Sequence, residues 1–414
     1  MFQVVSNCRD AGQPQCVGVA VWQGIFFSLL SGIVVACLSF VSEPIFRWVG
    51  HAPEIQRLEA EYFAIVCWAA PMSIASNALS GFFAGRGATR TLMIVHVSGF
   101  ALSIGLDYVL IFGKLGFPEM GMAGAAWANL LGQGCIALLL GILFLLPRFE
   151  HDFRTWSGCR WDAELFMRLV RFGVPNGARF AFELLAWNSF LIFVGRLGKT
   201  ENAVTNIVWA LNGFAFFPVI GLSEAVRALV GQAQGRGDPG TVKRCVWRGL
   251  LIGEIWMIAW ASIYLLFPGF LLGLFKGQGS FTAEDFAQVA LAGTILLRFV
   301  AFYCLLDAAN ILIMGALQGV GDTVWTFCAA LVMNASFLTA LWWVDRVRPE
   351  WAEHSWTTMQ FLYLEWSMAT AFVMLMALVW MARFASGRWK DLRVIETGPP
   401  ALSPPAPAAE TAAS

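Results

Sequence analysis

Charge is scarce in this sequence. Asp, Glu, Lys and Arg together make up 13% of its residues, about half the share found in a soluble domain. Hydrophobic residues make up 58%, and many apolar runs reach the roughly 20 residues that a helix needs to cross a hydrocarbon core of about 30 Å. The composition therefore excludes an ordinary soluble protein and predicts a polytopic membrane protein in contact with the lipid bilayer.

Net charge, catalytic motifs and cysteine pairs are also lacking. Basic and acidic residues balance at 27 each, so nothing in the charge favours nucleic-acid binding. No HExxH, GxSxG or Walker A sequence is present, which predicts a protein that is not an enzyme, needs no cofactor and is not driven by ATP. The nine cysteines form no CxxC pair, and we expect them to be small buried side chains.

The apolar runs predict ten transmembrane helices. Lys and Arg are about twice as frequent on one side of these spans as on the other, which predicts that both termini lie in the cytoplasm. The expected spans are 17–41, 59–83, 90–113, 121–147, 163–195, 202–230, 242–274, 286–318, 323–344 and 356–384.

Two short patterns recur along the chain. The glycines and threonine of 81–89, in the pattern GxxxGxGxT, recur at 315–323 with an offset of 234, and residues 12–24 resemble 237–249 with an offset of 225. Similar offsets in the same order predict a parallel internal repeat of two lobes. The expected division is a four-helix N-terminal lobe, a cytoplasmic linker, a six-helix C-terminal lobe and a disordered Pro/Ala-rich tail, at 1–148, 149–161, 162–386 and 387–414.

Several longer runs are similar to those of a known transporter family. They are Leu106–Gly121, Gly173-Val174-Pro175 followed by Glu183, Val230-Gly231-Gln232, and Tyr303–Asp307 leading into Gly315–Thr323. Together they resemble the NorM-like branch of the multidrug and toxin extrusion (MATE) family. The resemblance implies a two-lobed helical bundle in the inner membrane, acting as a monomeric antiporter that exports small organic cations in exchange for Na+ or H+. On the family's count of twelve helices, the first two are expected to be lacking.

Two other functions stay open. One is a flippase of lipid-linked precursors from the same superfamily, which we expect to need several cationic side chains, whereas only Arg179 and Arg298 lie deep in the predicted helices. The other is a truncated remnant that does not transport.

Ionisable residues inside the apolar runs are the candidates for function, because they are costly in a membrane. The resemblance implies that Glu183, Tyr303 and Asp307 form a site for the coupling Na+ or H+. Tyr303 and Asp307 are four residues apart, so they share one helix face. The alternative is that the carboxyl groups only hold helices together.

Three further polar residues are secondary candidates. Arg179 lies one turn before Glu183, at a spacing that favours an ion pair. Asn212 is a possible ligand or an interhelical hydrogen-bonding group. Asp107 is expected to cap the outer end of its helix or to couple the N-terminal lobe. Glu254 and Glu365 have no motif to support a role, and we expect His96 to be a hydrogen-bonded core residue.

Overall fold

The structure is a computed structural model that describes residues 15–49, 53–276, 283–353 and 356–391. Within these ranges every regular element is a helix. Ten of the described helices are long and apolar enough to span a membrane. The prediction of an all-α polytopic membrane protein with about ten transmembrane helices is confirmed.

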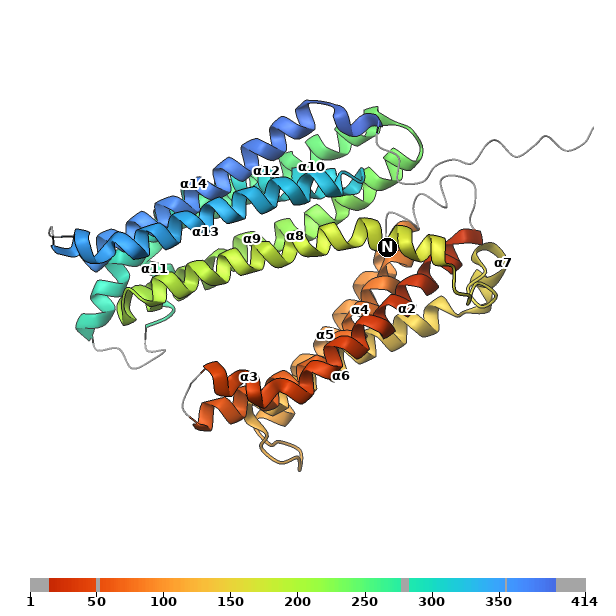
Figure 1. Ribbon diagram of the computed structural model, residues 1–414, viewed down its shortest axis with the longest axis horizontal. Coiled ribbons are helices and arrows are strands. Elements are labelled where there is room, and N and C mark those ends of the chain that lie inside the picture. Colours follow the sequence, from red (N-terminus) through yellow and green to blue (C-terminus); the bar gives the residue numbers. More distant parts are fainter. Residues whose placement is uncertain (1–14, 50–52, 277–282, 354–355, 392–414) are drawn as a thin grey trace, which may run out of the picture.

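Four of these helices form the N-terminal lobe. α4 lies between α2 and α6, and α5 packs against α6 (Figure 1). α2 continues through a turn of 3-10 helix, Leu38–Val41, into the short α3, Ser42–Val49. The four spans are α2 Gln15–Cys37, α4 Pro53–Gly85, α5 Thr89–Ile111 and α6 Gly121–Phe144.

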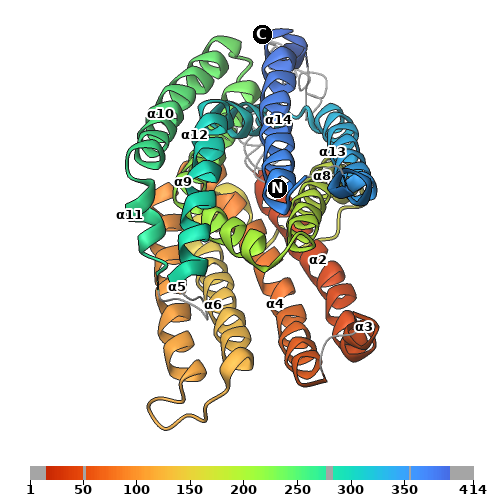
Figure 2. The ribbon, with the colours of Figure 1, turned by 90° about the vertical axis from the view of Figure 1, so that its left-hand side faces the viewer.

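The other six form the C-terminal lobe around α12. This helix packs against α9, α10 and α14, and a second pair, α8 and α13, completes the bundle (Figure 2). The core of this lobe is continuous from Ala186 to Trp389. The six spans are α8 Ala163–Gly195, α9 Lys199–Gly235, α10 Pro239–Leu266, α12 Ala283–Gly319, α13 Thr323–Glu353 and α14 Thr358–Ala385.

One predicted span breaks in the structure. The sequence predicts a single helix over 242–274, but α10 ends at Leu266 and the short α11 runs from Pro268 to Gly273. Proline has no N–H to donate and restricts the residue before it, and Phe267 accordingly leaves the helical region at φ −127° and ψ 40°. The remaining spans begin and end within a few residues of the prediction, except that α4, α9 and α13 are longer.

The chain between the lobes is tied to α2. It contains a 3-10 turn, Pro147–Phe149, and the short α7, Glu150–Phe153. The Trp22 indole donates to the Thr155 carbonyl (2.8 Å), and the Gln23 amide donates to the Arg160 carbonyl (2.8 Å). Hydrogen bonds from the Ser157 side chain and the Trp156 backbone lower the pKa of the Glu150 carboxyl, which caps this segment. The connection is therefore a folded segment hydrogen-bonded to the N-terminal lobe.

The repeated GxxxGxGxT pattern gives two equivalent turns. Gly87 after α4 and Gly321 after α12 have positive φ angles of 74° and 89°. In each turn, the glycine N–H donates to the carbonyl three residues back, and the next N–H donates to the carbonyl five residues back. The C-terminal end of α9 contacts both sites, through Gln232 to the Gly85 carbonyl and through Arg227 to Gln318. Both turns therefore lie at the same end of the molecule, as a parallel repeat requires.

The C-terminal copy of this turn carries a buried ion pair. Arg383 on α14 donates to both carboxylate oxygens of Asp322, at 2.7 and 3.2 Å, and stacks over the Trp325 ring at 4.6 Å. Paired, two-point contact of this kind compensates for the loss of water around both charges. The pair fixes the end of α14 to the turn between α12 and α13.

The two lobes meet at this end and diverge toward the other (Figure 1). The Gln232 amide on α9 lies 3.5 Å from the Gly85 carbonyl of α4. Aromatic contacts join α2 to the start of the C-terminal lobe, with Phe27 6.3 Å from Phe166 and Phe26 5.8 Å from Trp161 between ring centres. The lobes are thus closed at the end that carries the glycine turns.

Substitutions at the glycine turns should show their conformational role. Gly87→Ala and Gly237→Ala should each lower the free energy of unfolding by about 1–2 kcal/mol, because alanine is strained at positive φ. Nothing lies within 4 Å of an added Cβ at either site, so a clash cannot explain the loss. Gly134→Ala, in helical conformation and equally open, should be neutral or stabilising. Thermal unfolding in detergent measures the stability of all three variants. An equal loss of stability in all three would contradict the conformational role of Gly87 and Gly237.

Candidate functional site

Buried charge is confined to one lobe of the described structure. The buried charged side chains in the described ranges are Arg179, Glu201, Asp307, Asp322 and Glu365, all in the C-terminal lobe. The buried polar residues of the described N-terminal lobe are neutral ones such as Gln23 and Ser76. Ionisable groups inside a membrane protein are costly and concentrate at functional positions, so the C-terminal lobe is where a charge-binding site is to be sought.

α12 carries the central part of this site. Tyr303 and Asp307 are each 4% exposed, and their four-residue spacing places them on the same face of the helix. The structure therefore brings together two of the three residues predicted to form the coupling site.

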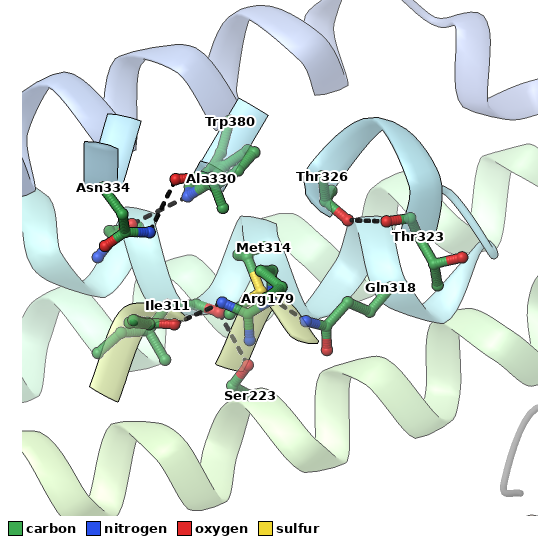
Figure 3. A network of polar contacts seen from close by, with 12 residues as sticks. Arg179, Ser223, Ile311, Met314, Gln318, Thr323, Thr326, Ala330, Asn334 and Trp380 are labelled. Atoms are coloured by element: carbon green, nitrogen blue, oxygen red, sulfur yellow. Dashed lines mark hydrogen bonds and ion pairs between the residues drawn. The ribbon is translucent and has the colours of Figure 1, made fainter. Parts of the chain in front are cut away.

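Asp307 is held by a relay of hydrogen bonds. The Asn310 side-chain N–H donates to Asp307 Oδ1 (3.1 Å), and Asn310 Oδ1 accepts from the indole N–H of Trp380 (3.1 Å). Trp380 is completely buried on α14, and in Figure 3 it lies beside Ala330 and Asn334 of α13. Because the indole can only donate, it fixes which way the Asn310 amide points. The relay leaves the other oxygen of Asp307 for a further partner.

The third predicted residue, Glu183, is paired with Arg179 on α8. Arg179 Nη1 donates to Glu183 Oε2 at 2.5 Å, and the two side chains are 5% and 27% exposed. The structure shows the ion pair that the four-residue spacing of these residues favours. Pro175, one turn before Arg179, removes a backbone hydrogen bond inside α8. The more exposed carboxylate is thus held by a cation that is itself almost fully buried.

Glu183 on α8 and Asp307 on α12 are the two acidic residues of the predicted site, and both belong to the C-terminal lobe. When ionised, these two carboxylates and the Arg179 guanidinium carry a net charge of −1, which one proton or one monovalent cation neutralises. In the described ranges, no three His, Cys, Asp or Glu side chains have metal-binding spacing. The chemistry therefore suits a proton, or Na+ held by carboxylate, phenol and carbonyl oxygens, since hard cations prefer oxygen ligands.

Neighbouring polar contacts hold α9 against α10 and α12. The Ser223 hydroxyl donates to the Ile311 carbonyl at 2.8 Å (Figure 3). The Tyr264 hydroxyl donates to the Leu211 carbonyl (2.9 Å), and the Trp256 indole to the Ala215 carbonyl (3.0 Å). Side-chain donors to backbone carbonyls of this kind join helices where water is excluded.

The secondary candidates lie in different places. Asn212 is 8% exposed on α9, and its Oδ1 has no hydrogen-bond partner among the described residues. Asp107 lies near the C-terminal end of α5, in the other lobe, so it is no part of this site. Arg298 is on the exposed side of α12. His96 lies 3.1 Å from the Ser80 hydroxyl, in agreement with a hydrogen-bonded core histidine.

Sequence reasoning missed Asn310 and Trp380. Asn310 is three residues after Asp307, and that spacing on a helix indicates a side-chain contact, so the signal was present. Trp380 lies on another helix 70 residues away, and one tryptophan among 19 carries no sequence signal of its own. Only the packing of α14 on α12 identifies it.

The sequence and the fold were compared with known proteins. A profile of the MatE family matches residues 2–109 and 175–341. The probable multidrug resistance protein NorM of Rhizobium meliloti is 31% identical over 335 residues, covering 80% of this chain and 70% of that protein. The NorM of Xanthomonas campestris is 29% identical and covers 77% of this chain and 68% of that protein.

Solved structures have the same fold. A multidrug resistance MATE family transporter of the MOP superfamily, in an outward-facing conformation, matches with a TM-score of 0.79 at 19% identity, covering 94% of this chain and 83% of that one. A MOP superfamily transporter from Pyrococcus furiosus matches with a TM-score of 0.79 at 20% identity over the same shares.

A double-mutant cycle should reveal the relay to Asp307. Trp380→Phe removes a donor to Asn310, so Trp380→Phe and Asn310→Ala should lower the free energy of unfolding non-additively, with a coupling on the order of 0.5–1.5 kcal/mol. Trp389 is equally buried and donates to the Phe384 carbonyl at 2.9 Å, so Trp389→Phe is the matched control and should be additive with Asn310→Ala. Additive losses in both cycles would refute the relay.

Proposed function

This chain belongs to the MATE family of multidrug efflux transporters, and from that premise we propose that it exports organic cations in exchange for Na+ or H+. The observation that carries the proposal is that the C-terminal lobe holds both Glu183, which is paired with the buried Arg179, and the buried Asp307. Their uncompensated charge is what an entering ion neutralises. We further propose that the protein works as a monomer in the inner membrane.

The shape of the molecule supports an exchange with the outside. More Lys and Arg flank the closed end, where the glycine turns lie, than the open end, and the positive-inside rule places such an end in the cytoplasm. The conformation is then open to the exterior. A Na+ or proton arriving from outside reaches Asp307 and Glu183 while the lobes are apart.

Exchange requires that the ion and the drug favour different states. An ion can shift the population only by its difference in affinity for the two conformations. Neutralising Asp307 removes the repulsion from Glu183 and lets the two side chains approach. We propose that this repacks α12 against α8 and lowers the affinity for the drug, which leaves to the outside.

The helices that border the gap carry aromatic side chains. α8 and α9 form the side of the C-terminal lobe nearest the N-terminal lobe (Figures 1 and 2). Phe180, Phe214 and Phe217 on these helices are more than half exposed. Aromatic faces attract cations by about 0.5–2 kcal/mol each, which supports organic cations as the substrates.

The rival proposal of a lipid-precursor flippase has less support. A pyrophosphate headgroup would need several cationic side chains that are free to bind it. In the described C-terminal lobe, Arg179 is engaged by Glu183 and Arg298 lies on the exposed side of α12. Neither provides a basic cavity.

Transport by proteoliposomes tests the proposal. The parental protein should drive ethidium movement under an imposed Na+ or proton gradient, and Asp307→Asn or Glu183→Gln should reduce the rate by at least about tenfold, because each removes one of the two interacting charges. Glu224→Gln is the matched control, since Glu224 is an exposed carboxylate paired with Arg227 on α9 and should transport at the parental rate.

Three results would decide against parts of the proposal. If Asp307→Asn retained the parental rate, the coupling site would be wrong. If the folded parental protein moved no ethidium under either gradient, the non-transporting remnant would be favoured. If it moved a fluorescent pyrophosphate lipid instead, the flippase would be.

A further inference from the structure

Glu365 on α14 is a buried carboxyl group outside the site described above. It is 2% exposed, and within the described ranges its Oε2 has no hydrogen-bond partner. It lies two turns after the start of α14 at Thr358, whereas the relay to Asp307 reaches α14 at Trp380. These 15 residues of helix correspond to about 22 Å, so the two carboxyl groups lie at different depths.

Charged groups surround Glu365 at the open end of the lobe. α14 packs against α8, α9, α12 and α13. On α13, which packs against α14, Asp345 pairs with Arg348 (3.5 Å) and with Arg196 from the end of α8 (2.8 Å). On α9, Glu201 accepts from the Thr358 hydroxyl (2.6 Å). α12 contributes Arg298, which is exposed.

Asp345 pairs with Arg348 and Arg196, the cationic side chains that could stabilise an ionised Glu365. An ionised carboxylate buried without a cation or hydrogen-bond donors is strongly disfavoured, and in practice the group becomes protonated. Arg348 is directed to Asp345, which also binds Arg196. The lack of a cation for Glu365 in this conformation therefore favours its neutral, protonated form.

The position of Arg348 on α13 allows its side chain to move from Asp345 to Glu365. Pro349 is inside α13 and cannot donate to the Asp345 carbonyl, so the last turn of α13 lacks one backbone hydrogen bond. Arg196 stays available to balance Asp345 if Arg348 turns away from it. Arg348 would then pair with Glu365, which could ionise.

We propose that Glu365 is a second proton-binding site, loaded from the open end of the C-terminal lobe and emptied when Arg348 transfers from Asp345 to Glu365. The ligand is a proton, and the carboxyl oxygen with no partner is where it binds. The proposal rests on the proposed function in one respect, since the transfer follows from the movement of the lobes. It differs from the coupling site in residues, depth and counter-ion.

Proton counting on the purified full chain tests the proposal. Tetraphenylphosphonium has no titratable group, so its binding heat in buffers of different ionisation enthalpy reports only protons released or taken up by the protein. The parental protein should release protons on binding, and Glu365→Gln should reduce the number by up to one. Arg348→Gln should cause the same reduction, because Glu365 then has no cation to ionise against.

Glu201→Gln is the matched control. Glu201 is a buried carboxylate at the same end of the lobe, 6% exposed, but it is hydrogen-bonded to Thr358. Its substitution should leave the number of released protons unchanged. A loss equal to that of Glu365→Gln would show a general effect of charge at this end and would overturn the proposal.

Asp307→Asn separates this proposal from the proposed function. If the two sites are distinct, Glu365→Gln should remove the same number of released protons from the parental protein and from Asp307→Asn. If Glu365→Gln released as many protons as the parental protein and only Asp307→Asn released fewer, the second site would be overturned and the coupling site would stand. Loss in Glu365→Gln with no effect of Asp307→Asn on release or transport would overturn the coupling site alone.

Thermal unfolding shows whether Glu365→Gln is stably folded. Glutamine resembles the protonated carboxyl, so Glu365→Gln should melt at or above the parental temperature. A lower melting temperature would show that an ionised Glu365 stabilises this conformation, which contradicts the proposal. Arg348→Gln gives an independent measurement if the first variant is not stable.

Discussion

The free-energy cost of a charge away from water governs this protein. Each buried charged group in the C-terminal lobe meets that cost in a different way. Asp322 is held by the two-point contact with Arg383, Glu201 accepts a hydroxyl, and Asp307 accepts from Asn310. A buried charge whose hydrogen bonds and ion pairs fully offset its lost hydration has a structural role. A buried charge with too few such partners is stabilised by binding an ion or a proton. By this criterion we propose Asp307 and Glu365 as sites for exchange and Asp322 as a structural contact.

The same constraint separates the lobes by role. In the described N-terminal lobe the buried polar groups are neutral, and its folded connection to α8 is hydrogen-bonded to α2 through Trp22 and Gln23. The C-terminal lobe contains the buried charges and a central helix, α12, that packs mainly against α9, α10 and α14. The two lobes therefore differ in the kind of polar group that they bury.

The candidate residues form two levels along the C-terminal lobe. Near the middle, Arg179 pairs with Glu183, and Asp307 accepts a hydrogen bond from Asn310 but has no cation partner among the described residues. Near the open end, Asp345 binds both Arg196 and Arg348 and leaves Glu365 without a cation. In both places the buried carboxyl groups lack enough cationic partners. Their ionisation therefore depends on the ions and protons around them, because an unpaired buried charge costs free energy.

The sequence alone determined the class of the protein and most of its local structure. Long apolar runs can be satisfied in a membrane only as helices, so the ten spans could be predicted, and a proline explains the break at Phe267. The repeated glycines at 87 and 321 predicted a parallel repeat, and both adopt the positive φ that glycine allows. The resemblance in motifs supplied Glu183, Tyr303 and Asp307, and the four-residue spacing of Arg179 and Glu183 favoured the ion pair that the structure shows. The tertiary structure alone decided which distant side chains meet: that Trp380 orients Asn310, that Asp322 pairs with Arg383, and that Arg348 binds Asp345. Spacing along one helix fixes contacts within it, whereas contacts between helices depend on how their faces pack, which no local pattern records.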